Sequence, residues 1–169
     1  MGSIAFLFMS ATERFTPEKG QNEPTGHVLD EMTFADLPEV LAIERASFSD
    51  PWPESAFMQG LSCTTCYSRV SRTDGHISGY LIAYLNGPEL HIANIAVSPA
   101  FRRQGVAKKL LGDALHNSNL GCTRAVLDVR ESNYSAINLY LGLGFTLAGR
   151  RPRYYRRPVE DALVMRKEL

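Results

Sequence analysis

Hydrophobic positions recur with two different periods along the chain, and the two periods predict strands and helices in alternation. Short apolar or alternating runs are typical of strands, and they fall at residues 28–34, 66–71, 77–85, 89–97, 124–130, 145–149 and 162–167. Apolar residues at helical spacing predict helices near residues 36–46, 55–60, 105–117 and 136–143. This order of elements predicts an α/β domain in which helices cover the faces of a sheet.

Capping and turn residues mark several of the expected element ends. Asp36 and Glu39 have the spacing of a capping box at the start of the first helix. Asn86-Gly87-Pro88 predicts a turn between two neighbouring strands. Gly144 can end the last helix, because glycine adopts the left-handed conformation at which many helices stop.

The first 27 residues differ in character from the rest of the chain. An apolar run at residues 4–9 is too short for a membrane span and has no basic residue before it, so it lacks the form of a secretory signal. Residues 10–27 are polar apart from Ala11 and Phe15. We therefore expect a flexible leader at residues 1–27, followed by one compact domain at residues 28–169.

Charge and composition narrow the classes of partner. The 169 residues include 18 Lys and Arg and 18 Asp and Glu, so the formal net charge is zero. Phosphate backbones usually select a basic excess, so we expect no direct binding of nucleic acid. No later segment is apolar enough to cross a bilayer, and we expect no membrane partner.

The cysteines leave two interpretations to weigh. Cys63 and Cys66 form a C-x-x-C pair, which could indicate metal or redox chemistry. A zinc site takes about four ligands, and only Cys122 and four scattered histidines remain in the sequence. We therefore favour structural thiols and expect no metal. Free thiols are typical of the reducing cytoplasm.

Residues 94–107 carry the most distinctive chemistry. An apolar strand ends, a short loop turns, and a helix begins at Gly105. The first turn of a helix exposes unpaired N–H groups and the positive end of the helix dipole, and glycine lets an anion approach the backbone. Phosphate binding and a plain strand–loop–helix connection both remain open on these grounds. No P-loop and no G-x-G-x-x-G motif occurs.

The same segment resembles the GNAT acetyltransferases, and a second motif narrows the likeness. Arg102-Arg103-Gln104-Gly105-Val106-Ala107 matches their Arg/Gln-x-x-Gly-x-Gly/Ala signature. Residues 127–145 resemble the RimI family pattern Leu-Glu-Val-Arg-x-Ser-Asn-x-x-Ala-x-x-Leu-Tyr-x-x-Leu-Gly-Phe, and residues 48–54 resemble its Phe-Pro-Trp-Ser-Glu loop with an insertion. The likeness covers about residues 28–167. It implies the GNAT fold, a mixed sheet of about six or seven strands flanked by about four helices.

The resemblance also implies a coenzyme and the residues that bind it. Members of this family use acetyl-CoA and hold its pantetheine arm along a strand, as β-augmentation does. By this resemblance, the residues that bind the pantetheine arm are Ile95, Ala96 and Val97. The residues that bind the pyrophosphate are Arg102, Arg103, Gln104, Gly105, Val106 and Ala107. Asn133 matches a coenzyme contact, and it also suits a helix cap.

Two residues match the catalytic positions of the family. Tyr140 corresponds to the general acid that protonates the leaving sulfur, although its place on an apolar stripe also suits core packing. Asp128 stands where RimI-like proteins carry a glutamate base. Aspartate is shorter by about 1.5 Å, so it either acts through one water or anchors a neighbour such as Arg130. In the second case Glu44 or Glu131 takes the proton.

The resemblance also implies an acceptor for the acetyl group and the residues that bind it. Trp52, Glu44, Tyr154 and Tyr155 are expected to bind the acceptor. The arginines at 150, 151, 153, 156 and 157 could contact RNA, but a solvated surface is favoured. The expected function is acetylation of a protein N-terminus in the cytoplasm, the N-terminal alanine of a small-subunit ribosomal protein. The alternatives are a small-amine or lysine acetyltransferase and a catalytically decayed CoA-binding module.

Overall fold

The computed structural model describes residues 26–117 and 120–169, so residues 1–25 of the expected leader lie outside the described part. The strands are β1 (Val28–Glu31), β2 (Cys66–Thr73), β3 (His76–Asn86), β4 (Glu89–Val97), β5 (Arg124–Arg130), β6 (Thr146–Arg156) and β7 (Val159–Glu168). The α-helices are α1 (Leu37–Ser47), α2 (Glu54–Ser62), α3 (Val106–His116) and α4 (Tyr134–Gly142). Two short 3-10 turns, η1 (Phe34–Asp36) and η2 (Pro99–Phe101), precede α1 and α3.

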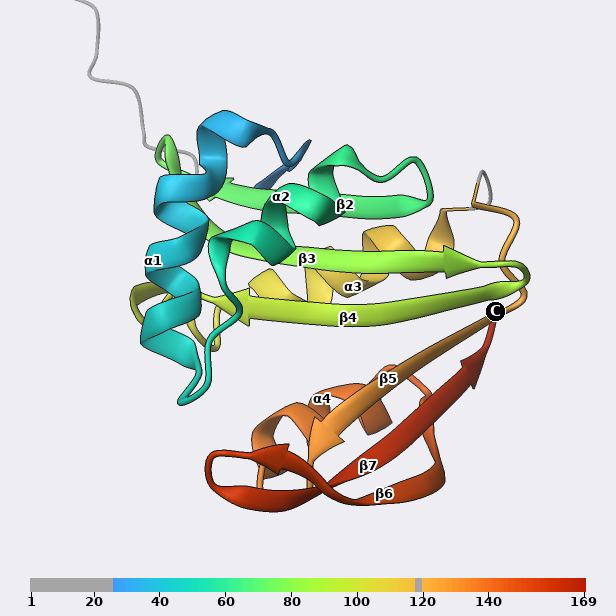
Figure 1. Cartoon of the computed structure of the whole chain (residues 1–169). Coiled ribbons are helices and arrows are strands. Elements are labelled where there is room, and N and C mark those ends of the chain that lie inside the picture. Colours follow the sequence, from blue (N-terminus) through green and yellow to red (C-terminus); the bar gives the residue numbers. More distant parts are fainter. Residues whose placement is uncertain (1–25, 118–119) are drawn as a thin grey trace, which may run out of the picture.

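The seven strands form one mixed sheet in the order β1-β2-β3-β4-β5-β7-β6. Only the β4–β5 pair is parallel among these neighbours, and the others are antiparallel. Helices α1 and α2 cover one face, and α3 and α4 cover the other (Figure 1). The expected fold class, an α/β domain with a mixed sheet of about six or seven strands flanked by about four helices, is confirmed.

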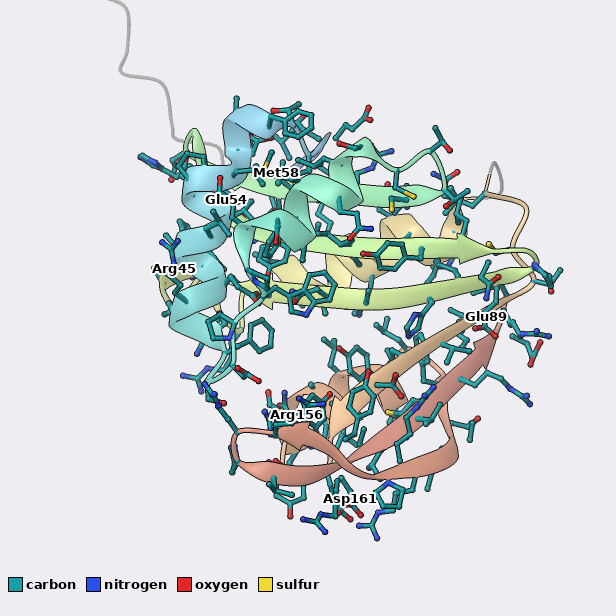
Figure 2. The ribbon with its side chains drawn as sticks, in the orientation of Figure 1. Arg45, Glu54, Met58, Glu89, Arg156 and Asp161 are labelled. Atoms are coloured by element: carbon teal, nitrogen blue, oxygen red, sulfur yellow. The ribbon has the colours of Figure 1, made fainter. Side chains whose placement is uncertain are left out.

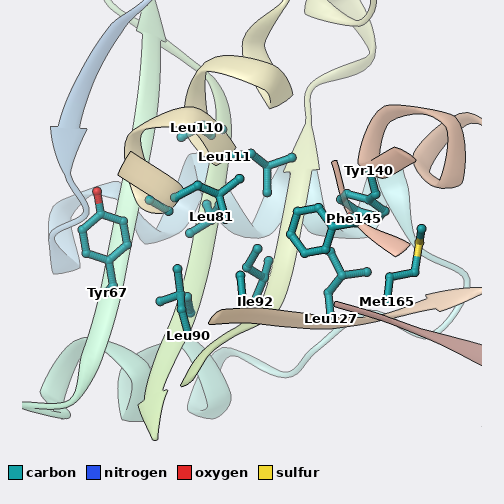
Figure 3. Packing of buried hydrophobic residues seen from close by; sticks show 14 of the residues in the cluster. Tyr67, Leu81, Leu90, Ile92, Leu110, Leu111, Leu127, Tyr140, Phe145 and Met165 are labelled. Carbon is teal, nitrogen blue, oxygen red and sulfur yellow. The ribbon is translucent and has the colours of Figure 1, made fainter. Parts of the chain in front are cut away.

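Each face of the sheet has its own core. Leu110 and Leu111 of α3 pack with β-strand residues such as Leu127 on one face, together with Tyr140 and Phe145 (Figure 3). Complete burial of a leucine side chain stabilises the folded state by about 1.5–3 kcal/mol. Burial of its apolar stripe therefore holds α3 against the sheet. On the other face, α1 and α2 pack against the sheet through Met32, Leu37, Val40, Leu41, Ile43, Phe57, Val70, Ile77, Tyr80, Ile82 and Ala96.

Strands β4 and β5 pair along only part of their length. Their register runs from Glu89 opposite Arg124 to Ile92 opposite Leu127, and it stops there. Beyond that point the two strands diverge, as Figure 1 shows. The edge of β4 from Ala93 onward therefore has no β5 partner for its backbone N–H and C=O groups.

A β-bulge in β4 lies where this divergence begins. Ile92 pairs with Ala83 and Asn94 pairs with Ile82, so Ala93 has no residue opposite it on β3. Side chains alternate between the two faces along a strand, so the extra residue moves each later side chain of β4 to the face opposite the one that strict alternation predicts. Ile92 packs in the core beneath α3, whereas Ala96 packs in the core beneath α1.

Several element ends differ from the expectation, and three differences are instructive. The capping box of Asp36 with Glu39 is wrong: the Asp36 carboxylate accepts from the backbone N–H of Thr33 at 2.8 Å and caps η1, while Glu39 accepts from the N–H of Ile77 at 3.0 Å. Strand β1 ends early because η1 follows it. Strand β6 is much longer than the expected residues 145–149. The expectation was too short because the second half of β6 is exposed and rich in arginine, so it lacks the apolar alternation that indicates a strand.

Candidate active site

Two adjoining cavities open where β4 and β5 diverge. The loop cavity, about 600 Å³, is lined by β4 and by the loop before α3. The hairpin cavity, about 700 Å³, is lined by β4, β5, α1 and the β6 side of the β6–β7 hairpin. The residues that line both cavities are Ser47, Phe48, Ile95, Asn133, Ala136 and Tyr140. They mark the junction of the two spaces.

The loop cavity contains nearly all of the residues expected at the coenzyme. Its lining includes Ile95, Ala96, Val97, Arg102, Arg103, Gly105, Val106 and Ala107. Gln104 is the exception and does not line it, because its side chain turns away and donates to the carbonyl oxygen of Ala100 at 3.0 Å. The strand supplies backbone, and the loop supplies amides and two guanidinium groups.

Gly105 has the geometry that anion binding at a helix start requires. Its φ is +87°, and a Cβ built there meets no atom within 4 Å, so the space beside it is open. Gly105 precedes α3, and its carbonyl oxygen accepts the first helical bond from the Lys109 N–H at 2.9 Å. The N–H groups of the first turn have no intrahelical partner, and this favours a phosphate in the loop cavity.

Arg102 ties the loop to two other elements. Its Nε donates to the carbonyl oxygen of Val97 at 3.2 Å, and one terminal nitrogen lies 3.3 Å from the hydroxyl of Ser47 on α1. Arg103 has a φ of +61°, which is unusual for a residue with a side chain. The loop therefore holds a fixed, bent backbone beside the cavity.

Asn133 and Tyr140 lie at the junction of the cavities. Asn133 is the N-cap of α4, with its Oδ1 accepting from the Ala136 N–H at 3.2 Å. Tyr140 is buried and packs against Phe145, with ring centroids 5.8 Å apart. Burial raises the pKa of the Tyr140 phenol above its usual range, and nearby Tyr155 raises it further. The tyrosine is thus a core residue that also lines both cavities.

Asp128 lines the hairpin cavity from β5, and its side chain is 9% exposed. Arg151 Nε donates to its Oδ1 at 3.0 Å, and His91 Nε2 lies 3.8 Å from its Oδ2. The idea that Asp128 anchors Arg130 is wrong. Arg130 instead pairs with Glu160, at 3.2 Å, and donates to backbone carbonyls of the hairpin.

Glu44 reaches the same cavity from α1, although it is only 1% exposed. One carboxylate oxygen accepts from the Trp52 N–H at 2.7 Å, and the other contacts the Tyr80 hydroxyl and Asn94 Nδ2, the latter at 3.3 Å. Burial, and then the Glu44 charge, raise the pKa of Tyr80. This buried network holds the carboxylate in one position.

Tyr154 and Tyr155 line the cavity from β6, their rings edge to face at 5.2 Å. Tyr155 donates to the Asp128 carbonyl oxygen at 3.4 Å, and the Arg130 guanidinium lies 4.1 Å from its ring centroid. Burial, followed by the Asp128 charge, raises the pKa of Tyr155 to about 12. Trp52 joins the lining and packs edge-on against Phe57.

Of the remaining candidates, only Arg156 lines a cavity. Glu131, an alternative base, is paired with Arg150 and lines neither cavity. Arg156 does line the hairpin cavity, and Figure 2 shows it on the side of the hairpin that faces α1, with Asp161 on the opposite side. The other arginines of the cluster, at 150, 151, 153 and 157, are exposed.

Sequence reasoning missed three neighbours of the carboxylates: Tyr80, Asn94 and His91. Asn94 carried a signal, since it is a polar residue at a position where the alternation of β4 calls for an apolar one. Tyr80 and His91 carried none, because each becomes significant only through a partner far away in sequence.

Metal ligands, thiols and apolar helices complete the description of residues 26–117 and 120–169. No group of three or more His, Cys, Asp or Glu side chains there is arranged to hold a metal ion. Cys63, Cys66 and Cys122 are free thiols. Within the same residues, no helix combines the length and the apolar content needed to cross a membrane.

Comparison with known proteins agrees with this geometry. An uncharacterized protein of Mycobacterium leprae is 36% identical over 159 residues, or 90% of this chain, and the chain spans 43% of its length. A putative [ribosomal protein bS18]-alanine N-acetyltransferase of Bacillus subtilis is 33% identical over 136 residues, covering 79% of this chain and 90% of that protein.

The crystal structure of the ribosomal-protein-S18-alanine N-acetyltransferase from Escherichia coli has the same fold. Its TM-score is 0.79 at 29% identity, with coverage of 85% of this chain and 94% of that one. The model of the acetyltransferase (GNAT) family matches residues 37–145. The chain therefore belongs to the GNAT acetyltransferase family, resembles its RimI-type members, and is an N-acetyltransferase that takes its acetyl group from acetyl-CoA.

Proposed function

We propose that the chain acetylates the N-terminal α-amine of a protein, namely the N-terminal alanine of a small-subunit ribosomal protein. The observation that carries this proposal is the meeting of two cavities at Tyr140, one lined by the anion-binding loop and the other by Asp128, Glu44 and a tyrosine pair. The activity named for the Bacillus subtilis and Escherichia coli relatives supports the choice of acceptor. A cytoplasmic location follows from an acceptor of this kind.

The loop cavity is assigned to the coenzyme. Beyond Ile92, the edge of β4 lacks a β5 partner, so its backbone can pair with an extended amide-containing arm such as pantetheine. Ile95, Ala96 and Val97 lie along that edge. The N–H groups at Gly105 and the first turn of α3, with Arg102 and Arg103, suit the pyrophosphate. When bound, acetyl-CoA supplies the activated acetyl thioester at the junction.

The hairpin cavity is assigned to the acceptor. A protein N-terminus arrives largely as an ammonium group, and the carboxylates of Asp128 on β5 and Glu44 on α1, which both line the cavity, favour that charge. Trp52, Tyr154 and Tyr155 provide aromatic surface for the first side chains.

The proton transfers are assigned to two residues. The Asp128 carboxylate first accepts a proton from the ammonium group, directly or through one water. The neutral amine then bonds to the acetyl carbon, and its nitrogen releases a second proton to solvent. As the C–S bond breaks, the Tyr140 hydroxyl donates its proton to the sulfur. A phenol has an ordinary pKa of about 10 and burial raises that of Tyr140, so the hydroxyl is protonated at neutral pH, which is the state a donor needs. An α-amine has a pKa of about 7.7–8.0 against about 10.4 for lysine, so it needs less help from a base.

A comparison of acceptors tests this proposal. The acceptors are a peptide with a free N-terminal alanine, the same peptide with its N-terminus blocked and a lysine inside, and a set of small amines. Mass spectrometry should locate acetyl groups on the α-amine of the first peptide and nowhere on the second. Acetylation of the blocked peptide at lysine, or of small amines alone, would replace the proposal with the corresponding alternative.

A further inference from the structure

His27, just before β1, is bonded to the loop that precedes α3 and to the helix itself. Its Nε2 donates to the carbonyl oxygen of Gln104 at 3.0 Å, because a carbonyl can only accept. Its Nδ1 lies 2.7 Å from the hydroxyl of Thr73, and its own carbonyl oxygen accepts from Lys109 Nζ on α3. Both the ring and the backbone of His27 are therefore held in place.

The bond to Gln104 fixes the direction of the next N–H group. The carbonyl of Gln104 and the N–H of Gly105 belong to one peptide unit, and in a trans peptide they point in opposite directions. With the oxygen held by His27, the Gly105 N–H points away from His27. Gly105 lines the loop cavity and His27 does not, so the histidine contacts this peptide from the side away from the cavity.

The backbone at this point needs outside support. Arg103 has a φ of +61° and Gly105 a φ of +87°, so left-handed residues stand on both sides of Gln104. Such a conformation persists only where surrounding contacts hold it. Arg102 secures the loop before this segment, through Val97 and Ser47, and His27 secures the peptide between the two left-handed residues.

We propose that His27 is a positioning residue for acetyl-CoA binding: it orients the Gln104–Gly105 peptide toward the pyrophosphate without touching the coenzyme. The segment before β1 thereby contributes to coenzyme affinity, although it lies outside the family signature. This proposal rests on the assignment of the loop cavity to the pyrophosphate under the proposed function.

The test compares an acetyl donor that has a pyrophosphate with one that lacks it. In the full chain, His27→Ala should weaken CoA binding about three- to tenfold by calorimetry, the range that corresponds to loss of one hydrogen bond. With a peptide acceptor, KM for acetyl-CoA should rise by the same factor while kcat is unchanged. With acetyl-pantetheine as donor, His27→Ala and wild type should have equal kcat/KM.

Two further variants separate orientation from general damage. His27→Gln should recover most of the affinity, because its side-chain amide can still donate to the Gln104 oxygen. His76→Ala removes an exposed histidine at the start of β3 and should change neither donor's kinetics. An equal loss with both donors, or unchanged CoA affinity in a folded His27→Ala, would overturn the proposal.

The failure of the underlying assignment has its own signature. If Gly105→Glu leaves CoA affinity unchanged, the loop does not hold the pyrophosphate, whatever His27 does. If Gly105→Glu abolishes binding while His27→Ala has no effect, the loop assignment stands and the role of His27 is rejected. The calorimetric measurement needs no acceptor, so an error in the identity of the acceptor leaves it unaffected.

Discussion

Arg151 on β6 donates to the carboxylate of Asp128 on β5 at 3.0 Å, reaching over β7, which lies between these two strands in the sheet. The pair commits one oxygen of Asp128 to a guanidinium and leaves the other, Oδ2, 3.8 Å from His91 Nε2. Asp128 is therefore held by neighbours at the same place where the proposed mechanism needs a base. Substitution can separate these two roles.

Asp128→Asn should lower activity at neutral pH, by about 10²- to 10⁴-fold if Asp128 supplies the whole of the general-base effect. The loss should shrink as the pH rises above the pKa of the acceptor amine, because more amine is then already neutral. Asp128→Glu should keep or raise activity. A pH–rate profile of the three proteins is the measurement. If Asp128 only anchors Arg151, both variants should instead melt at lower temperature, with no recovery at high pH.

Tyr140→Phe should reduce kcat by about 10²- to 10⁴-fold and leave the dissociation constant of acetyl-CoA nearly unchanged. Phenylalanine keeps the ring that packs on Phe145 and loses only the hydroxyl. An effect confined to kcat indicates an interaction made in the transition state. Turnover at the wild-type rate would remove Tyr140 from the mechanism.

Gly105→Glu should abolish measurable acetyl-CoA binding in calorimetry. It places a side chain and a negative charge in the open space beside the helix start, where the pyrophosphate is expected. Gly112→Glu, within α3, is a control for the added charge, because a Cβ there also meets no atom within 4 Å and its position lies away from the loop cavity. Gly105→Ala is the control for backbone strain, because it places a side chain at the same φ of +87° without the charge. Similar losses in the two glutamate variants would point to a general charge effect.

The free energy of unfolding should fall as the pH rises from 10 to 12. Burial, then the Asp128 charge, raise the pKa of Tyr155 from 10.0 to about 12, so the folded state favours the neutral phenol. That contribution is complete below pH 10 and is lost as the pH rises through 12. Denaturant titrations from pH 8 to 12 should show a shallower decline for Tyr155→Phe than for wild type. Equal slopes would mean that Tyr155 titrates alike in both states.

Local patterns in the sequence were sufficient for the elements and for half of the site. The helical spacing of Leu110, Leu111 and Ala114, and a glycine before them, predict where α3 begins and that an anion can bind there. The N-cap position of Asn133 is likewise set by its neighbours, since its side chain bonds to the backbone three residues later. These features depend on contacts within one turn, which a linear sequence displays directly.

The sequence by itself determined which segments are helix or strand, and the tertiary structure decided which side chains meet. Strict alternation along β4 would place Leu90, Ile92 and Asn94 on one face, but the unpaired Ala93 turns Asn94 to the opposite face, where it bonds to Glu44. A bulge is a property of a strand pair, and no single strand encodes it. Likewise, Asp128 meets Arg151 because the sheet order β5-β7-β6 brings them together, and that order is fixed by the packing of the whole domain.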